Sequence, residues 1–329
     1  MTAMTSEDGI GNGGVADMMC CALCGTAKVD NIKLNESCVS CDFDLVRCCN
    51  DGSEEKHKPN DRQVRKKQEA DIREDILFRQ PESSHLGDCP ICLVPLSLDT
   101  NHSVMLSCCS KLICIGCYYA RICIRCEVEQ MTKKESSCPF CRQPEPKTDS
   151  EIELYKMRRI RANDPVAMIE AGKRFYHSGD YAGAFDYFTR TSGLDGVVAE
   201  AHYCLSFMYM DGKGVERNVM ESLYHLEEAA IGGQPKARHD LGVHEMERGR
   251  IERAAKHFII ASNNGHDLSV KAIRELSAKG YVSRKDFVMA LRAHKAAVDA
   301  ARSPQREAAV AVGVIQILDK SRSVRVNGK

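Results

Sequence analysis

Apolar positions in the second half of the chain recur with the period of an α-helix and, on a longer scale, at the length of a helical hairpin. Ala167, Ala201 and Ala237 are 34 and then 36 residues apart, and each lies in an amphipathic segment. Repeats of this length are typical of stacked helical hairpins, none of which buries its apolar face without a neighbour. We therefore expect an α–α helical repeat solenoid over residues 150–302, whose weakest copy spans 267–302.

Turn and capping signals separate the expected helices. Gly212 and Gly214 lie between the two helices of the second copy, where a residue without a side chain easily adopts a positive φ. Ser150, followed three residues later by Glu153, predicts a capping box at the start of the first helix. Before the repeats, the charged stretch 60–78 predicts one more helix.

The composition changes where the repeats begin. The chain has 329 residues and 18 cysteines, 17 of which precede residue 142. The 46 basic and 46 acidic residues balance, so charge favours neither nucleic acid nor an anionic membrane as a partner. Met1–Met19 holds no apolar signal segment, and no apolar run of about 18 residues follows. We expect an intracellular protein, cytoplasmic or nuclear, whose clustered cysteines bind metal rather than form disulfides.

Four close pairs of cysteines lie between residues 89 and 141. They are Cys89 and Cys92, Cys108 and Cys109, Cys114 and Cys117, and Cys138 and Cys141. A C-x-x-C pair supplies two of the four ligands of a tetrahedral zinc ion. A segment of about fifty residues buries little core, so we expect metal to supply its folding energy.

This layout resembles a RING-type zinc finger, in which the ligand pairs alternate between two zinc ions. The resemblance implies one site at Cys89, Cys92, Cys114 and Cys117, and another at Cys108, Cys109, Cys138 and Cys141. Three residues before the third pair, where RING fingers commonly have a histidine, this chain has Lys111, whose ammonium cannot ligate zinc. We expect Cys108 and Cys109 to serve together, with His102 as the alternative.

Two spare cysteines follow the third pair. Cys123 and Cys126 are three residues apart in an expected helix and so share one face. Because free cysteine behaves as a small apolar residue, we expect them to pack rather than to bind metal.

The RING resemblance implies a role in ubiquitin transfer without any catalytic side chain. Such ligases hold a charged ubiquitin-conjugating enzyme in an attack-ready pose, which accelerates transfer by orientation. By resemblance, Ile91 and Pro139 contact the conjugating enzyme and Arg142 bridges it to ubiquitin. The chain lacks tryptophan, which many RING ligases use on that surface. Two functions stay open: a ubiquitin-protein ligase whose repeats bind an unknown protein substrate, and a non-catalytic protein-protein interaction adaptor. A zinc hydrolase is excluded, because closed cysteine sites leave no position for water.

The first cysteine group resembles a degenerate MYND-type zinc finger. Its first five ligand positions are occupied by Cys21, Cys24, Cys38, Cys41 and Cys49. The remaining three hold Ser53, Asp61 and Arg65. One additional zinc site and a remnant without metal are both compatible with this loss.

Tyr209–Asn218, followed by Ala229, Ala230 and Gly232, resembles the Sel-one-like repeat, a relative of the tetratricopeptide repeat. The resemblance implies protein binding along the solenoid. The scattered histidines are expected to be solvated or singly paired; they are His177, His202, His225, His239, His244 and His257. Tyr176, Tyr203 and Tyr209 are expected to pack between repeats.

These patterns together predict an α-rich multidomain chain in which a small zinc-stabilised RING-like module precedes the solenoid. The expected boundaries are 1–19 disordered, 20–66 MYND-like module, 67–84 helical linker, 85–145 RING-type finger, 150–302 repeats and 303–329 tail.

Overall fold

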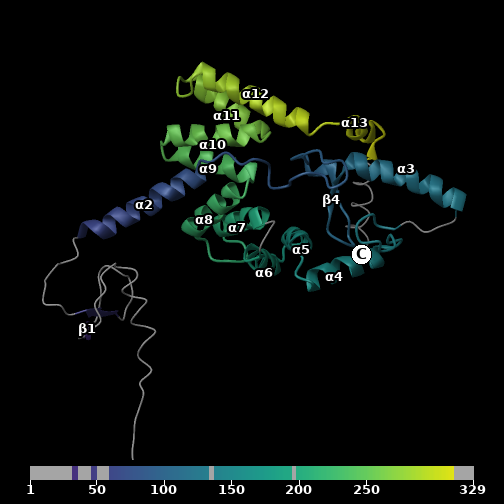
Figure 1. Cartoon of the computed structure of the whole chain (residues 1–329), viewed down its shortest axis with the longest axis horizontal. Helices are drawn as coiled ribbons and strands as arrows, with labels where there is room; N and C mark the ends of the chain where they lie inside the picture. Colours follow the sequence, from purple (N-terminus) through teal and green to yellow (C-terminus); the bar gives the residue numbers. More distant parts are fainter. Residues whose placement is uncertain (1–31, 36–45, 50–58, 133–136, 195–197, 315–329) are drawn as a thin grey trace, which may run out of the picture. The chain divides into compact units, whose positions relative to one another are not determined.

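A computed structural model describes residues 32–35, 46–49, 59–132, 137–194 and 198–314 (Figure 1). The chain divides into two compact units, residues 1–75 and 76–329. In the first unit, β1 (Ile32–Asn35) pairs antiparallel with β2 (Val46–Cys49). Of the MYND-like ligand candidates, Cys21, Cys24, Cys38 and Cys41 lie outside the described residues, as does the segment 1–19. Only the backbone of Cys49 is described.

The second unit is dominated by helices. A long helix, α2 (Pro59–Leu77), enters it from the first unit. The helices that follow are α3 (Ile115–Thr132), α4 (Asp149–Arg161), α5 (Pro165–His177), α6 (Tyr181–Ser192), α7 (Val198–Asp211), α8 (Val219–Ile231), α9 (Pro235–Glu247), α10 (Ile251–Asn263), α11 (Asp267–Ala278), α12 (Arg284–Ala300) and α13 (Pro304–Ala311). None of the described helices combines the length and apolar character needed to cross a bilayer.

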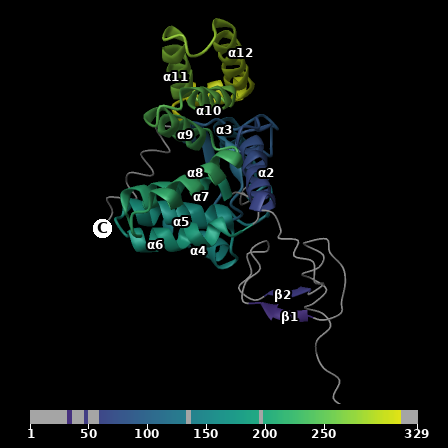
Figure 2. The same ribbon diagram turned by 90° about the vertical axis from the view of Figure 1, so that its left-hand side faces the viewer.

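Helices α5 to α12 stack as successive hairpins, which confirms the helical repeats. Helix α5 packs on α6, α7 on α8, and α9 on α10, and each hairpin also contacts the next (Figure 2). The turn glycines Gly212 and Gly214 have φ values of 68° and 74°, in the left-handed region. The weakest predicted copy forms α11 and α12, which pack against α10.

In two of the hairpins, a glycine on one helix lies against a phenylalanine ring of the other helix where the two cross. A Cβ at Gly172 would lie 2.6 Å from the Phe188 ring, and one at Gly242 would lie 2.6 Å from the Phe258 ring. Both rings are buried, so glycine is what lets them enter the crossing. In the hairpin between them, α7 and α8 each contribute a serine to the crossing, and Ser222 Oγ donates to Ser206 O at 2.8 Å.

The capping box before the repeats lies two residues earlier than the sequence suggested. Thr148 Oγ1 accepts a hydrogen bond from Glu151 N, and Glu151 Oε2 accepts one from Thr148 N. Ser150 and Glu153 therefore do not form the box. Both pairs have the required spacing, but Glu153 instead pairs with Arg174 of α5, with Arg174 Nη1 2.8 Å from Glu153 Oε2.

The histidines of the repeats are less solvated than expected. His202 Nδ1 and His225 Nδ1 are 2.7 Å apart, so these two residues meet rather than standing singly. His257 is fully buried, and neither ring nitrogen has a hydrogen-bond partner in the described part of the chain. Of the tyrosines expected between repeats, Tyr203 bonds to Asp240 of the next copy, with O–O 3.1 Å.

The segment that leads from α2 to the second cysteine group packs on the repeats. Leu77 is buried against α8 and α9, and the Arg238 guanidinium donates to the carbonyl of Leu77. The Phe78 ring packs against the His257 ring, with centroids 4.6 Å apart and planes tilted by 36°. Further along, His85 N donates to Gly233 O at 3.1 Å. The helical part of the expected linker thus ends at Leu77, and the rest is held by α8, α9 and α10.

The segment after Ser303, which the sequence leaves as an unassigned tail, begins with a helix. This helix, α13, packs on α3, where Ala309 and Val314 meet Ile115 in one buried cluster. The C-terminal end of the repeats is thereby joined to the cysteine-rich module.

Candidate metal centre

The second cysteine group is built on a small hairpin and the start of α3. The strands β3 (Ser103–Met105) and β4 (Leu112–Cys114) pair antiparallel, and α3 begins directly after β4. This places Cys114 at the end of the strand and Cys117 on the first turn of the helix. Turns on either side of these elements bring in the remaining cysteines.

Two of these turns have the same backbone geometry. In the first knuckle (residues 89–94), Leu93 N donates to Cys89 O at 2.8 Å and Cys89 N donates to Val94 O at 3.0 Å. In the second knuckle (residues 138–143), Arg142 N donates to Cys138 O at 3.0 Å, and Cys138 N donates to Gln143 O at 2.8 Å. Leu93 and Arg142 have positive φ values of 56° and 59°, and the paired hydrogen bonds hold this uncommon conformation.

A third turn, residues 106–111, repeats the pattern with one change. Ser110 N donates to Leu106 O at 2.8 Å, Leu106 N donates to Lys111 O at 3.0 Å, and Ser110 has a φ of 57°. Leu106 thus stands where the other two turns have their first cysteine. Cys109 occupies the position of the second cysteine, and Cys108 beside it supplies the other thiol.

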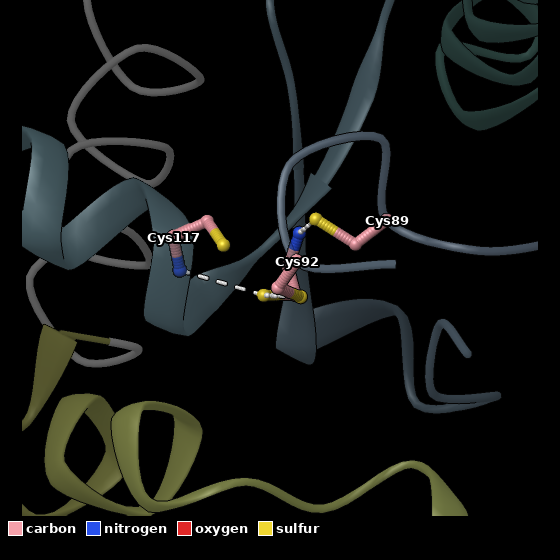
Figure 3. A group of neighbouring side chains, drawn as sticks. Cys89, Cys92 and Cys117 are labelled. Atoms are coloured by element: carbon pink, nitrogen blue, oxygen red, sulfur yellow. Dashed lines mark hydrogen bonds between the residues drawn. The ribbon is translucent and has the colours of Figure 1, made fainter. Parts of the chain in front are cut away.

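The structure brings the eight cysteines together in two groups, whose members alternate along the chain. The groups are Cys89, Cys92, Cys114 and Cys117, and Cys108, Cys109, Cys138 and Cys141. Within each group the sulfurs all lie within 4.8 Å of one another. Figure 3 shows Cys89 and Cys92, on the first knuckle, and Cys117, on α3, turning their sulfurs toward a common centre.

The sulfur spacing fits a tetrahedral zinc ion. A zinc–sulfur bond is about 2.3 Å long, so two ligands of one ion are about 3.8 Å apart. Cys92 Sγ and Cys114 Sγ are 3.8 Å apart, and Cys109 Sγ and Cys138 Sγ are 3.7 Å apart. A disulfide would bring its sulfurs to about 2.05 Å, and all of these cysteines are free.

Two backbone amides donate hydrogen bonds to sulfurs of the first group. Cys114 N lies 3.4 Å from Cys89 Sγ, and Cys117 N lies 3.4 Å from Cys114 Sγ, so both amides donate to sulfur. Such donors stabilise the thiolate form that a metal ion requires.

The thiols of each group differ in acidity. Burial raises the pKa of Cys89, but backbone N–H groups of Cys114 and of its own knuckle outweigh burial and lower the pKa to about 7. Cys138 is also buried, and N–H groups of its knuckle lower its pKa to about 7. Burial and then the neighbouring thiols raise the pKa of Cys108 and Cys117. A metal ion therefore binds these groups in competition with protons.

The alternative ligands stay outside both groups. His102 belongs to neither group and lies near Asp99, with Nδ1 3.8 Å from the carboxylate oxygen. Lys111, which replaces the usual histidine, is exposed. Cys123 is half-buried on α3 and belongs to neither group, while the side chain of Cys126 is outside the described residues.

The residues expected at the recruitment surface are exposed. Ile91 is 44% exposed on the first knuckle, and Leu93 beside it is 75% exposed. Pro139 and Arg142 are exposed on the second knuckle. Another arginine of the same module, Arg121 of α3, forms an ion pair with Glu145.

Sequence reasoning missed one residue at the first group. Arg306 of α13 is 5% exposed, and its Nη2 lies 3.7 Å from Cys92 Sγ. It is separated from Cys92 by 214 positions in the chain and lies in no recognisable motif, so no local signal pointed to it.

No protein-family model matches the chain, and no curated protein matches it in sequence. Among solved structures, a protective antigen of uropathogenic Escherichia coli strains that displays an SLR fold is similar, with 24% identity and a TM-score of 0.38 over 45% of this chain and 33% of its own. A Sel1 repeat protein from Oxalobacter formigenes is also similar, with 17% identity and a TM-score of 0.40 over 46% of this chain and 65% of its own. The present chain thus spans less than two thirds of the length of either protein.

Proposed function

We propose that residues 85–145 bind two zinc ions and recruit a charged ubiquitin-conjugating enzyme, while the helical repeats bind the protein to be modified. The observation that carries the metal part is the alternation of two four-cysteine groups at zinc-like sulfur spacing. Because each group offers four thiols, both sites are closed and structural. The zinc supplies folding energy to a module with a small core.

The two knuckles support the recruitment part of the proposal. Each presents an exposed apolar residue, Ile91 on the first knuckle and Pro139 on the second. Arg142 is exposed on the second knuckle, whose turn is held by the hydrogen bond from Arg142 N to Cys138 O. Its planar fork of donors suits a bridge between two proteins. The module needs no nucleophile, because orientation alone accelerates the transfer.

The helical repeats support the substrate part. Stacked hairpins present extended surfaces that bind other proteins. Residues 77–85 of the chain itself cover part of α8, α9 and α10. The substrate is therefore expected to bind on the remaining surface of the repeats.

Metal content is tested by native mass spectrometry of the purified chain. Two zinc ions per chain are expected if the cysteines of residues 20–66 bind none, and three or four if they bind metal. A chain that holds no zinc when prepared with zinc present would rule out the metal part.

Ligase activity is tested by autoubiquitination with a panel of conjugating enzymes, comparing wild type with Ile91→Ala and Arg142→Ala. Both variants are expected to lose most chain formation while keeping their zinc. Lys111→Ala is the matched control, because it removes an exposed cation of the same module that is not among the residues of the proposed contact. A zinc-loaded chain without activity toward any conjugating enzyme would leave the adaptor as its function. Activity untouched by both substitutions would exclude the proposed surface.

A further inference from the structure

The guanidinium of Arg306 is fixed between the repeats and the first knuckle. Its Nη2 lies 3.7 Å from Cys92 Sγ and donates to Val94 O at 2.9 Å. Its Nη1 donates to Pro95 O at 2.6 Å and to Ala301 O at 2.5 Å. Four acceptors thus surround one buried cation. Three of them belong to the first knuckle or to Pro95, the residue that follows it.

The backbone of α13 is held close enough to make these contacts. A Cβ at Gly116 would lie 2.7 Å from Arg306 N, so α3 and α13 approach more closely than another residue would allow. Ile115 and Ala309 are fully buried in the same contact. The position of Arg306 is therefore set by packing and does not depend on the thiols alone.

We propose that Arg306 is an outer-shell partner of the first zinc site, in which its guanidinium offsets the charge of the thiolates and fixes the knuckle. This inference rests on the proposed zinc binding. A zinc ion with four thiolates carries a net charge of about −2, and burying that charge is unfavourable without a nearby cation or hydrogen-bond donor. Arg306 supplies both at Cys92.

The same side chain also closes the knuckle. Val94 O accepts a hydrogen bond from Cys89 N as well as from Arg306 Nη2, so the guanidinium binds the carbonyl that completes the turn. Partners of this kind orient metal ligands, and their removal typically weakens metal binding by about 10–100-fold. Ala301, which caps α12, is bound by the same guanidinium. Zinc at the first site and the order of the C-terminal end of the repeats are therefore expected to stabilise each other.

The test compares Arg306→Gln and Arg306→Lys with wild type in the full zinc-loaded chain. Zinc release to a chelator is followed together with alkylation of each cysteine by mass spectrometry. In Arg306→Gln the first site is expected to lose about 10–100-fold in zinc affinity, with faster alkylation of Cys92. The cysteines of the second group should react at the wild-type rate. Arg306→Lys keeps the charge but not the fork, so it should lie between the two.

The matched control is Arg302→Gln, which removes an exposed arginine that pairs with Glu307 on the same segment. This variant should release zinc as wild type does. Equal alkylation of Cys92 in wild type and Arg306→Gln would overturn the proposal. Equal losses in Arg306→Gln and Arg306→Lys would overturn the role of the charge. A wild-type chain without zinc would instead contradict the proposed function itself.

Discussion

At the residue scale, His257 is unusual in being a titratable side chain buried without a hydrogen-bond partner among the described residues. Burial lowers its pKa, and the positive charges of Arg238, Arg253 and Lys256 add to this effect, to about 3. The folded protein therefore keeps His257 neutral, whereas the unfolded chain protonates it below a pH of about 6.5. Its contribution to stability is complete above that pH and is lost as the pH falls from about 6.5 toward 3.

We expect His257→Leu to lose less stability on acidification than wild type, by about 1–2 kcal/mol between pH 6.5 and pH 5. Thermal unfolding followed by circular dichroism at both pH values measures the difference. Because zinc release also depends on pH, the informative quantity is the variant minus wild type. His177→Leu, at an exposed position on α5, is the control. Parallel pH profiles for wild type and His257→Leu would contradict the assignment.

At the element scale, the crossing of α9 and α10 depends on the absence of a side chain at Gly242. An alanine in a helix is ordinarily about 1 kcal/mol more stable than a glycine. At Gly242, however, the added Cβ would lie 2.6 Å from the buried Phe258 ring. Overpacking of this kind costs about 1–3 kcal/mol, which equals or exceeds the gain in helix stability.

We therefore expect Gly242→Ala to lower the free energy of unfolding, by up to about 2 kcal/mol, rather than to raise it. The midpoint of urea unfolding, followed by the helical signal, measures the change. Gly193→Ala is the matched control, because the one described atom near its added Cβ would be Arg190 O, at 3.9 Å. A stabilised Gly242→Ala variant would show that the helices can separate at this crossing.

The elements that sequence predicted best are those specified by neighbouring residues. The C-x-x-C spacing is enough for the turn of a knuckle, and the hairpin repeat fixes which faces of α5 to α12 are buried. The third turn was harder to predict. Leu106 occupies the position of the first cysteine, so no C-x-x-C pair marks this turn in the sequence. The position of Arg306 beside Cys92 could not be predicted from the sequence, because it depends on how α13 packs against α3.

At the scale of the whole molecule, two segments connect the cysteine module to the repeats within residues 76–329. Residues 77–85 pack on α8, α9 and α10, and α13 packs on α3. The buried clusters of the repeats nevertheless contain none of the eight grouped cysteines. The repeats therefore have cores of their own, whereas the module has a core made largely of its cysteines together with Leu96, Leu106 and Ile113.

Removal of zinc is thus expected to unfold residues 89–141 and to release α13, while α5 to α11 stay folded. Chelation followed by hydrogen exchange measures this directly: protection should fall in the module and in residues 304–314, and stay in the repeats. Acidification should act in the same direction, because protons compete with zinc for the thiols. Arg302→Gln treated with chelator should give the wild-type pattern, since the ion pairs of Arg302 are with Asp299 and Glu307, neither of which belongs to the module. If the helical signal of the repeats disappears in the same transition as the module, then the contacts of residues 77–85 and α13 make one cooperative unit. In that case the boundary expected between residues 145 and 150 divides the sequence but not the folded protein.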